Sequence, residues 1–513
     1  MSFNLDRRTF LLGTSALMAL PYGRFANAAG REKPIVAMEF DISNLDPGNR
    51  TGVSDDNVIL ACMQTLARFE PGKLTWANDA AKEIRQVSET EFEFELNPGQ
   101  MFTGGYGEMT AEDVKFSFDR FIHGDANGKK LTYAEDLGAL KSVEVTGKYT
   151  GRLILKHPSP ALWLIGLCDG SGAILSKKAA GELGDKIATT IVGSGPFVMK
   201  DWRPKEQLVL AANPDYSGPY KAKFPEIICR VIGEKKTSFL SYQAREIDFT
   251  AFEADQVEDA KALPESKVID IPGIDYTWIG INVEKGDLAD IKVRQAIRWA
   301  IDVEAIIQGA YAGAVSRARS LLAPGLLGYW ENAPLYDRDV EKASALLAES
   351  GKSGLTFSFT CLNDTASMAV AQIVQANLAE VGIAIDINAL DAGAYWALGA
   401  DDASKDLELS LIPYSSKFDP SFQTQWFLAS QIGLWNWQRW NSPEFDKLHE
   451  EGLSIMDNAR RTEIYIKMQQ LLDDSASCVW ITHGRNFFVH ADWLEPAVLP
   501  NGKNWQFEFF DKA

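Results

Sequence analysis

Aromatic side chains crowd the stretch between residues 395 and 440, and their chemistry suits ligand recognition by stacking. The stretch holds Tyr395, Trp396, Tyr414, Trp426, Trp435, Trp437 and Trp440. Aromatic faces stack on sugar rings and aliphatic groups, while indole N–H and phenol O–H groups orient a polar ligand. The same side chains could instead fill the core of a large lobe. The segment 434–437 suits a polar, sugar-like ligand, and we expect the cluster to supply at least one pocket residue.

Sequence signatures of covalent, phosphate or metal chemistry are missing. The glycines of Gly193-Ser194-Gly195 adjoin the serine, whereas a nucleophile elbow has one residue between each glycine and the serine. Leu346 stands where a phosphate-binding loop ending at Gly351-Lys352-Ser353 would need glycine. The sequence contains no GxGxxG, HExxH or Cys/His cluster. We therefore predict a binding protein without a cofactor or metal site, and not an enzyme.

Strand and helix patterns alternate along the chain and predict an α/β or α+β architecture. Residues 91–96 alternate Glu with Phe or Leu, which predicts a half-buried strand. Thr110 to Asp113 reads as a capping box before a helix. Residues 291–307 carry an apolar stripe at helical spacing and predict one long helix. Further helices are expected at about 340–349, 369–381 and 461–472, and a strand at 383–387.

Length and charge narrow the class of protein. The chain has 513 residues, too many for one core, and its formal net charge is −19. Such an acidic surface repels nucleic acid and anionic lipid, so we expect a freely diffusing protein, most simply a monomer, without a nucleic-acid partner. The five cysteines are widely spaced and include no CxxC pair, so their pairing cannot be read from the sequence.

The first 28 residues have the pattern of an export signal. Arg7 and Arg8 precede an apolar run from Phe10 to Leu20, and Ala26-Asn27-Ala28 offers a small-x-small cleavage site. The run is too short to span a bilayer stably. A short buried helix carrying two arginines is the alternative. The order of the three features favours a twin-arginine signal peptide, a mature chain from about Ala29 and a periplasmic location.

Six segments, taken together, resemble extracytoplasmic solute-binding proteins of family 5, the oligopeptide-, dipeptide-, nickel- and opine-binding branch that serves ABC importers. The segments occur in the family's order and span nearly the whole mature chain: residues 45–47 (LDP), 109–117 (MTAEDVKFS), 192–197 (VGSGPF), 213–216 (NPDY), 291–302 (IKVRQAI with AID) and 419–420 (DP). The resemblance implies two lobes joined by a two-strand hinge, an extra domain inserted in lobe I, ligand capture by hinge closure and delivery to a membrane permease.

The resemblance also implies domain boundaries and site residues. The boundaries are 1–28 for the signal peptide, 29–62, 190–280 and 487–513 for lobe I, 63–189 for the inserted subdomain, and 281–486 for lobe II. By their place in the family pattern, Tyr133, Trp278, Asn282 and Arg485 are expected near the ligand, with Arg485 suited to a carboxylate. From the aromatic stretch we add Tyr395, Tyr414, Trp435 and Trp437.

One position departs from the family pattern. In peptide binders of the family, a carboxylate shortly before the Asp-Pro turn pairs with the ligand's α-amino group, and Ser416 stands at that position here. A hydroxyl cannot neutralise a buried ammonium. A shift of one or two residues in the alignment would give this role to Asp419. The sequence leaves that choice open.

The sequence as a whole predicts a binding protein for a small polar organic solute. The candidate solutes, in order, are an opine-like conjugate, an oligosaccharide and a short peptide. The alternatives are a dipeptide or oligopeptide carrier, an enzyme exported by the twin-arginine route, and a docking protein that uses the same cleft. The nickel branch is disfavoured because no histidine lies between Tyr414 and Trp437.

Overall fold

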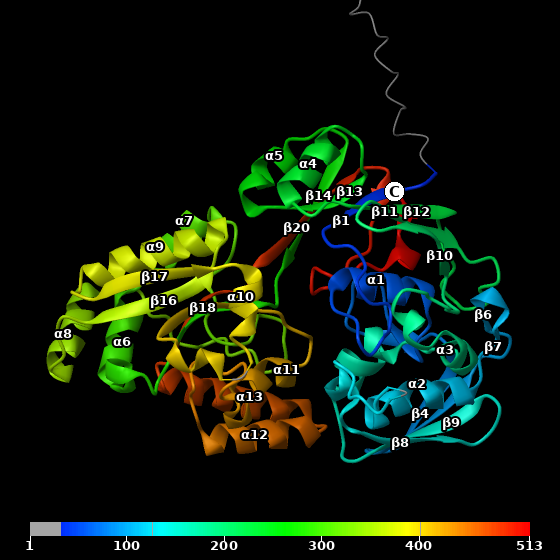
Figure 1. Ribbon diagram of the computed structural model, residues 1–513, viewed down its shortest axis with the longest axis horizontal. Helices are drawn as coiled ribbons and strands as arrows, with labels where there is room; N and C mark the ends of the chain where they lie inside the picture. Colours follow the sequence, from blue (N-terminus) through cyan, green and yellow to red (C-terminus); the bar gives the residue numbers. More distant parts are fainter. Residues whose placement is uncertain (1–31, 126, 401) are drawn as a thin grey trace, which may run out of the picture. The chain divides into compact units, whose positions relative to one another are not determined.

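The computed structural model describes residues 32–125, 127–400 and 402–513, and its strands form three main sheets (Figure 1). The predicted signal peptide, residues 1–28, lies outside the described residues. Within the described ranges, no helix has both the length and the apolar character needed to cross a membrane. Residues 33–513 form one compact unit. The mixture of sheets and helices confirms the predicted α/β class.

A seven-stranded sheet combines segments from the two ends of the chain. Its order is β10 (Phe197–Arg203), β11 (Gln207–Ala212), β12 (Glu226–Val231), β1 (Ile35–Met38), β13 (Phe249–Phe252), β20 (Arg485–Ala491) and β14 (Ser266–Pro272). Strand β1 runs parallel to β12 and β13, whereas β20 is antiparallel to both of its neighbours. Apolar side chains of this sheet, including Val36, Leu208 and Phe249, are fully buried.

A four-stranded antiparallel sheet contains the strand expected at residues 91–96. Its order is β4 (Ala81–Ser88), β5 (Glu91–Leu96), β9 (Thr150–Leu155) and β8 (Leu140–Val145). Helix α2 (Ala111–His123) packs on β8 and begins with the predicted capping box, in which Thr110 and Asp113 bond reciprocally. The sequence prediction is therefore confirmed here, because alternation buries one face of β5 and the capping box starts α2, which packs on β8 of the same sheet.

A five-stranded sheet is formed by the second half of the chain. Its order is β17 (Ala384–Leu390), β16 (Thr356–Leu362), β18 (Leu409–Tyr414), β15 (Tyr276–Ile281) and β19 (Cys478–Thr482). The longer helices of this half of the chain are α6 (Ile291–Ala300), α7 (Val303–Tyr311), α8 (Val340–Ser350), α9 (Thr365–Ala379), α12 (Pro443–Ser454) and α13 (Asn458–Asp474). The expected helices near 340, 369 and 461 and the strand at 383–387 are confirmed as α8, α9, α13 and β17.

The single helix expected over residues 291–307 was wrong, because the chain forms two helices there. Ile301 adopts an extended conformation, so α6 ends at Ala300. The Asp302 side chain then accepts a hydrogen bond from the Ala305 N–H and caps the start of α7. The apolar stripe continues across the break, since Ile297, Ile301 and Ile306 are all fully buried. Periodicity therefore found the buried face but not the interruption.

Two short segments join the five-stranded sheet to the seven-stranded sheet. The chain leaves β14 at Pro272 and enters β15 at Tyr276, and it returns from β19 at Thr482 to β20 at Arg485. The two segments touch, because the Gly273 N–H donates to the Gly484 carbonyl at 3.1 Å. The connection between the two sheets is thus three residues long in one segment (273–275) and two in the other (483–484). The domain boundaries expected from the family pattern remain a prediction.

Candidate functional site

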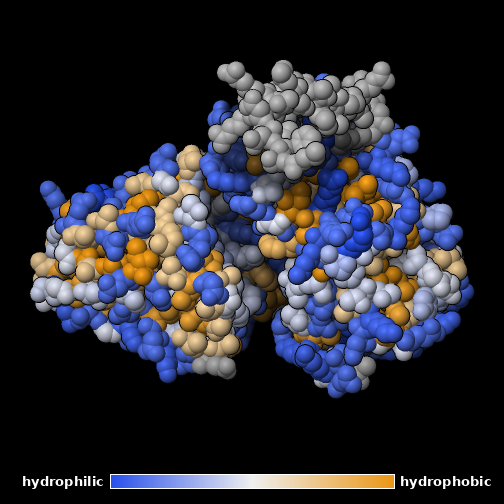
Figure 2. Space-filling model, turned by 45° about the horizontal axis from the view of Figure 1, so that its top comes forward, coloured by the Kyte–Doolittle hydropathy of each residue, from blue (hydrophilic) through white to orange (hydrophobic). Residues whose placement is uncertain are grey.

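A cavity of about 930 Å³ is lined by aromatic side chains from distant parts of the chain, and we call it the aromatic cavity. Its aromatic residues are Tyr133, Trp396, Tyr414, Phe422, Trp426 and Trp435. The volume falls within the range of pockets that enclose small organic ligands. Figure 2 shows a deep hollow in the surface, with hydrophilic and hydrophobic residues both reaching its edges. Polar residues, among them Thr132, Glu135 and Gln425, line the aromatic cavity beside the rings. The cavity can therefore take a ligand that has both ring-like or aliphatic faces and polar groups.

The end of β18 and the helix that follows it organise one wall of the aromatic cavity. Tyr414 ends β18, and its hydroxyl donates to the Trp435 carbonyl at 2.8 Å. The ring centroid of Trp435 lies 6.3 Å from that of Trp396 and 6.5 Å from that of Trp426. These contacts hold the indole planes before a ligand arrives, which reduces the entropy lost on binding.

Asp419 fixes the start of the short helix α11 (Pro420–Thr424) and faces away from the aromatic cavity. It is fully buried, and both of its carboxylate oxygens accept hydrogen bonds from Arg461 at 2.9 Å. One of those oxygens also caps α11 through the Ser421 N–H at 3.0 Å. Both oxygens of Asp419 therefore have structural partners, and Asp419 is not among the residues that line the aromatic cavity.

A second cavity of about 1010 Å³ adjoins the first, and Ser415 lines both. Arg485 lines the second cavity, but its guanidinium already forms a two-point pair with Asp270, at 2.6 and 3.0 Å. Lys503 lines it as well and forms an ion pair with Asp275. Both cations have carboxylate partners, so a ligand carboxylate would compete with these pairs for Arg485 or Lys503.

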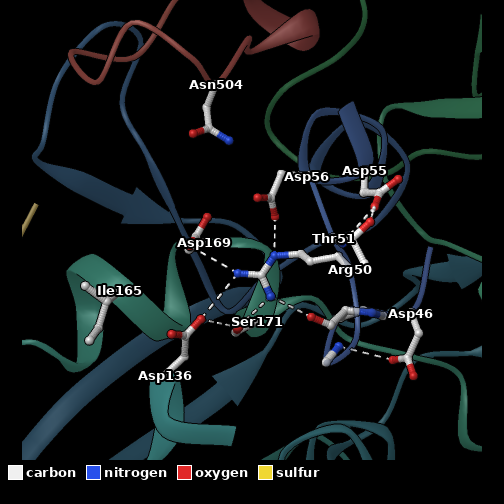
Figure 3. Close-up of polar contacts among 12 residues, drawn as sticks. Asp46, Arg50, Thr51, Asp55, Asp56, Asp136, Ile165, Asp169, Ser171 and Asn504 are labelled. Atoms are coloured by element: carbon white, nitrogen blue, oxygen red, sulfur yellow. Dashed lines mark hydrogen bonds and ion pairs between the residues drawn. The ribbon is translucent and has the colours of Figure 1, made fainter. Parts of the chain in front are cut away.

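Five charged residues form a buried network beside the aromatic cavity, and we call it the Arg50 cluster. It consists of Arg50, Asp56, Asp136, Asp169 and Lys417. Figure 3 shows the Arg50 guanidinium directed toward the three aspartates. The distances from Arg50 to Asp56, Asp136 and Asp169 are 2.5, 3.3 and 3.4 Å. With two cations and three carboxylates, the cluster has one acid in excess.

Burial and this excess shape the proton affinity of the cluster. Burial raises the pKa of Asp56 to about 7, and the negative charge of Asp169 adds to the effect although Arg50 opposes it. The cations, Lys417 foremost, hold the pKa of Asp169 below its usual range against the effect of burial. Burial thus disfavours the charged form of Asp56, whereas the two cations stabilise the charged form of Asp169.

The structure brings four of the expected site residues to the two cavities. Tyr133, Tyr414 and Trp435 line the aromatic cavity, and Arg485 lines the second one. Ser416 lies next to Ser415, where the two cavities meet. Its N–H donates to Asp275 at 2.9 Å, and its hydroxyl donates to the Lys417 carbonyl at 3.1 Å.

The other four expected site residues line neither cavity. Trp278, Asn282, Tyr395 and Trp437 are at most 1% exposed. Three of them bond to main-chain carbonyls: Asn282 to Leu407 at 2.8 Å, Tyr395 to Leu411 at 2.5 Å and Trp437 to Leu434 at 2.9 Å. Trp278 stacks on Tyr276 with ring centroids 5.1 Å apart. Trp278, Tyr395 and Trp437 pack against Tyr414 or Trp396 and so support the wall of the site from the interior. Asn282 lies beyond the other end of β15, away from Tyr414.

Sequence reasoning missed the Arg50 cluster and the histidines at the aromatic cavity. Lys417 contacts Asp136 across 281 residues of sequence, and no motif links the two positions. Phe422, His157 and His449 also line the aromatic cavity. The only sequence signal for Lys417 was its place between Ser416 and the Asp-Pro turn. Trp396 and Trp426 belonged to the aromatic stretch but were not chosen as site residues.

Two buried histidines make a pH dependence of stability predictable. Burial lowers the pKa of His449 and of His483 to about 4, against about 6.5 in an unfolded chain. Between these values the unfolded state binds the extra proton, so their stabilisation is complete above pH 6.5 and is lost as pH falls toward 4. Each histidine should lower the free energy of unfolding by about 3 kcal/mol as the pH falls from 6.5 to 4.

The variant His449→Asn tests this dependence. The asparagine amide matches the position of the histidine Nδ1, so it can keep the 2.9 Å contact with the Thr424 hydroxyl but has no proton to gain. Urea unfolding at pH 7 and pH 4 should show that the variant loses about 3 kcal/mol less stability than the wild type on acidification. Equal losses in the two proteins would mean that His449 is not buried as a neutral group.

Comparisons with known proteins match this chain over most of its length. The family model for bacterial extracellular solute-binding proteins, family 5, middle part, matches residues 77–433. The "Probable D,D-dipeptide-binding periplasmic protein" of Escherichia coli (strain K12) is 27% identical over 471 residues, which cover 88% of this chain and 89% of the relative. The "Probable di/tripeptide-binding protein 5" of Pseudomonas aeruginosa (strain UCBPP-PA14) is 29% identical over 476 residues, covering 87% and 88%.

Solved structures show the same fold. The ABC transporter-associated periplasmic binding protein of Helicobacter pylori, solved with the peptide STSA, has a TM-score of 0.78 and 25% identity, covering 93% of this chain and 99% of that one. This likeness confirms the expected periplasmic-binding-protein fold. Because the family model spans well over half of the sequence, the chain belongs to the bacterial extracellular solute-binding proteins of family 5.

Proposed function

We propose that this protein is the periplasmic solute-binding component of an ABC importer. It captures a small polar organic solute in the aromatic cavity by closure about the segments 273–275 and 483–484, and delivers the solute to the permease in the inner membrane. It does so as a monomer and without a cofactor, and its chemistry is binding rather than catalysis. Lobe I, the inserted subdomain and lobe II have the boundaries given by the family pattern.

The aromatic cavity is the observation that carries this proposal. In the sequence, Tyr133 lies between β5 and β8 of the four-stranded sheet. Tyr414 and Trp435 belong to the second half of the chain, which forms the five-stranded sheet. A ligand in contact with both sides stabilises the arrangement in which they approach, which is how a hinge is biased toward closure. The aromatic lining supplies stacking surface, and the polar groups at its edge supply orientation.

The candidate solutes are an opine-like conjugate, an oligosaccharide and a short peptide. The first two suit the stacked indoles, because a sugar or sugar-derived chain presents both C–H faces and hydroxyls. The short peptide is the second candidate function, and the names of the relatives favour it: the proteins of E. coli and P. aeruginosa are described as peptide-binding. At Ser416, however, this chain offers no charge for a peptide's ammonium group.

A thermal-shift screen of residues 29–513 tests the proposed function. The screen uses opines, oligosaccharides, dipeptides and tripeptides, and nickel complexes. A solute at one hundred times its dissociation constant stabilises the folded state by about 2.7 kcal/mol. We expect a shift with one solute class and recovery of the solute unchanged. Chemical conversion of the solute, or the absence of a shift with every class, would contradict the proposal.

We propose the twin-arginine route for export, because Arg7 and Arg8 precede the apolar run and the cleavage site. Replacing both residues, Arg7→Lys with Arg8→Lys, is expected to nearly abolish the periplasmic pool measured by immunoblotting of cell fractions. Arg24→Lys, in the same segment but outside the pair, is the matched control and should export normally. The exported protein should begin at Ala29. Normal export of the double variant would refute the assignment.

A further inference from the structure

The ammonium group of Lys417 occupies a pocket in which every one of its donors has an acceptor. Its Nζ atom lies 2.8 Å from Asp136 Oδ2, 3.1 Å from Asp169 Oδ2 and 3.4 Å from the Ile165 carbonyl oxygen. An ammonium group has three N–H donors, and three acceptors satisfy them. Figure 3 shows Asp136 and Asp169 between Arg50 and Ile165. The pocket thus has the donor–acceptor balance of a primary-ammonium site.

Two aromatic rings complete this pocket, which we call the ammonium pocket. The Lys417 Nζ atom lies 5.3 Å from the ring centroid of Tyr133 and 5.6 Å from that of Phe422. At these distances the faces of the rings attract a cation. Tyr133, Asp136, Ile165 and Phe422 also line the aromatic cavity, so the ammonium pocket borders the space proposed for the ligand.

The charge balance makes a cation necessary in this pocket. Without Lys417, Arg50 would be the one cation of the cluster to face its three carboxylates, Asp56, Asp136 and Asp169. The Asp136 and Asp169 oxygens that Arg50 contacts are the same ones that Lys417 contacts. Lys417 reaches the pocket from the segment between β18 and α11, and its side chain is 16% exposed. Uncompensated buried carboxylates are costly. The lysine therefore fills, from within the chain, a site that would otherwise attract an external ammonium.

We propose that Lys417 determines ligand specificity by filling the ammonium pocket with its own ammonium group, so that the captured solute presents no primary ammonium there. This inference rests on the proposed function and narrows its substrate class. Solutes without a primary ammonium are favoured: oligosaccharides, conjugates whose nitrogen is secondary, and peptides with a blocked amino terminus. A free amino-terminal peptide would have to displace a tethered cation that cannot diffuse away.

Chemical rescue tests the ammonium pocket without any transported solute. Lys417→Ala removes the three terminal carbons and the nitrogen, which n-propylammonium replaces atom for atom. We expect the variant to melt several degrees below the wild type and millimolar n-propylammonium to restore most of the loss. The neutral isostere n-propanol and an equal concentration of tetramethylammonium should not restore it. A variant that folds only with n-propylammonium counts as rescue, and a variant that stays unfolded with it overturns the proposal.

Two further variants are controls for the rescue. Lys417→Met keeps a long side chain in the ammonium pocket without charge and should not respond to n-propylammonium. Lys503→Ala removes a lysine whose carboxylate partner, Asp275, is 36% exposed, and it should not respond either. An equal response of either control, or of the wild type, would show that the amine acts elsewhere and would overturn the proposal.

The specificity itself is measured with a dipeptide and its N-acetyl derivative. Isothermal titration should show that the free dipeptide binds Lys417→Ala at least tenfold more tightly than the wild type, while the acetylated form shows no such gain. Equal gains for both forms would overturn the specificity role. The rescue experiment contains no solute, so a failure of the proposed function leaves its result intact, and a failed rescue leaves the solute screen intact.

Discussion

Replacing Arg461 with methionine is expected to lower the free energy of unfolding by about 3–5 kcal/mol. The change leaves the Asp419 carboxylate in a fully buried position without the two 2.9 Å hydrogen bonds from Arg461. It also removes the bond from Arg461 Nε to the Gly452 carbonyl at 3.0 Å. A buried charge that has lost its partner is destabilising because neither water nor another cation replaces the lost interaction. Urea unfolding followed by circular dichroism measures the loss.

The neighbouring arginine is a matched control for this prediction. Arg460 lies on the same helix and forms ion pairs with Glu451 and Glu463, but its side chain is 50% exposed. Arg460→Met removes the same charge and should lower the free energy of unfolding far less, because exposed ion pairs contribute little to stability. Equal costs for the two substitutions would contradict the structural role given to Asp419.

Trp396→Ala is expected to weaken binding of the solute identified by screening by about 10- to 100-fold. Trp396 lines the aromatic cavity and is 38% exposed, so one of its faces is free to contact a ligand. Losing a stacked indole costs about 1.5–3 kcal/mol of binding free energy, which corresponds to this range of affinities. Isothermal titration with the purified protein measures the change.

Trp76 offers a control of similar exposure outside both cavities. It is 42% exposed and stacks on Trp163 with ring centroids 5.4 Å apart. Trp76→Ala should leave the affinity for the solute unchanged, although it removes the same side chain. If Trp396→Ala binds as tightly as Trp76→Ala, the aromatic cavity is not the binding site.

Local patterns predicted the elements of the fold better than their interruptions. Residues 91–96 and the capping box at Thr110 specify their structure within a few residues, so alternation and capping were sufficient. The break at Ile301 was missed because the apolar stripe runs through it, and only the cap by Asp302 marks the new helix. The resemblance to a family supplied the overall fold, which composition and periodicity alone did not specify.

The candidate site was only partly predictable for a related reason. Tyr414 and Trp435 lie within one stretch of sequence, so an aromatic cluster pointed to them. The same cluster also included Tyr395 and Trp437, whose hydroxyl and indole groups bond to main-chain carbonyls in the interior. Aromatic residues serve both core and pocket, and the sequence carries no sign of which face is free. The pairing of Lys417 with Asp136 depends on tertiary structure and has no local signature.

Hydrogen–deuterium exchange of residues 29–513, with and without the solute identified by screening, tests the central claim most directly. The account predicts that the solute protects backbone amides of residues 132–139 and 413–435, which border the aromatic cavity, and of the connecting segments 273–275 and 483–484. Protection confined to other regions, such as the separate cavity beside residues 112–125, would contradict the claim that the solute is captured in the aromatic cavity.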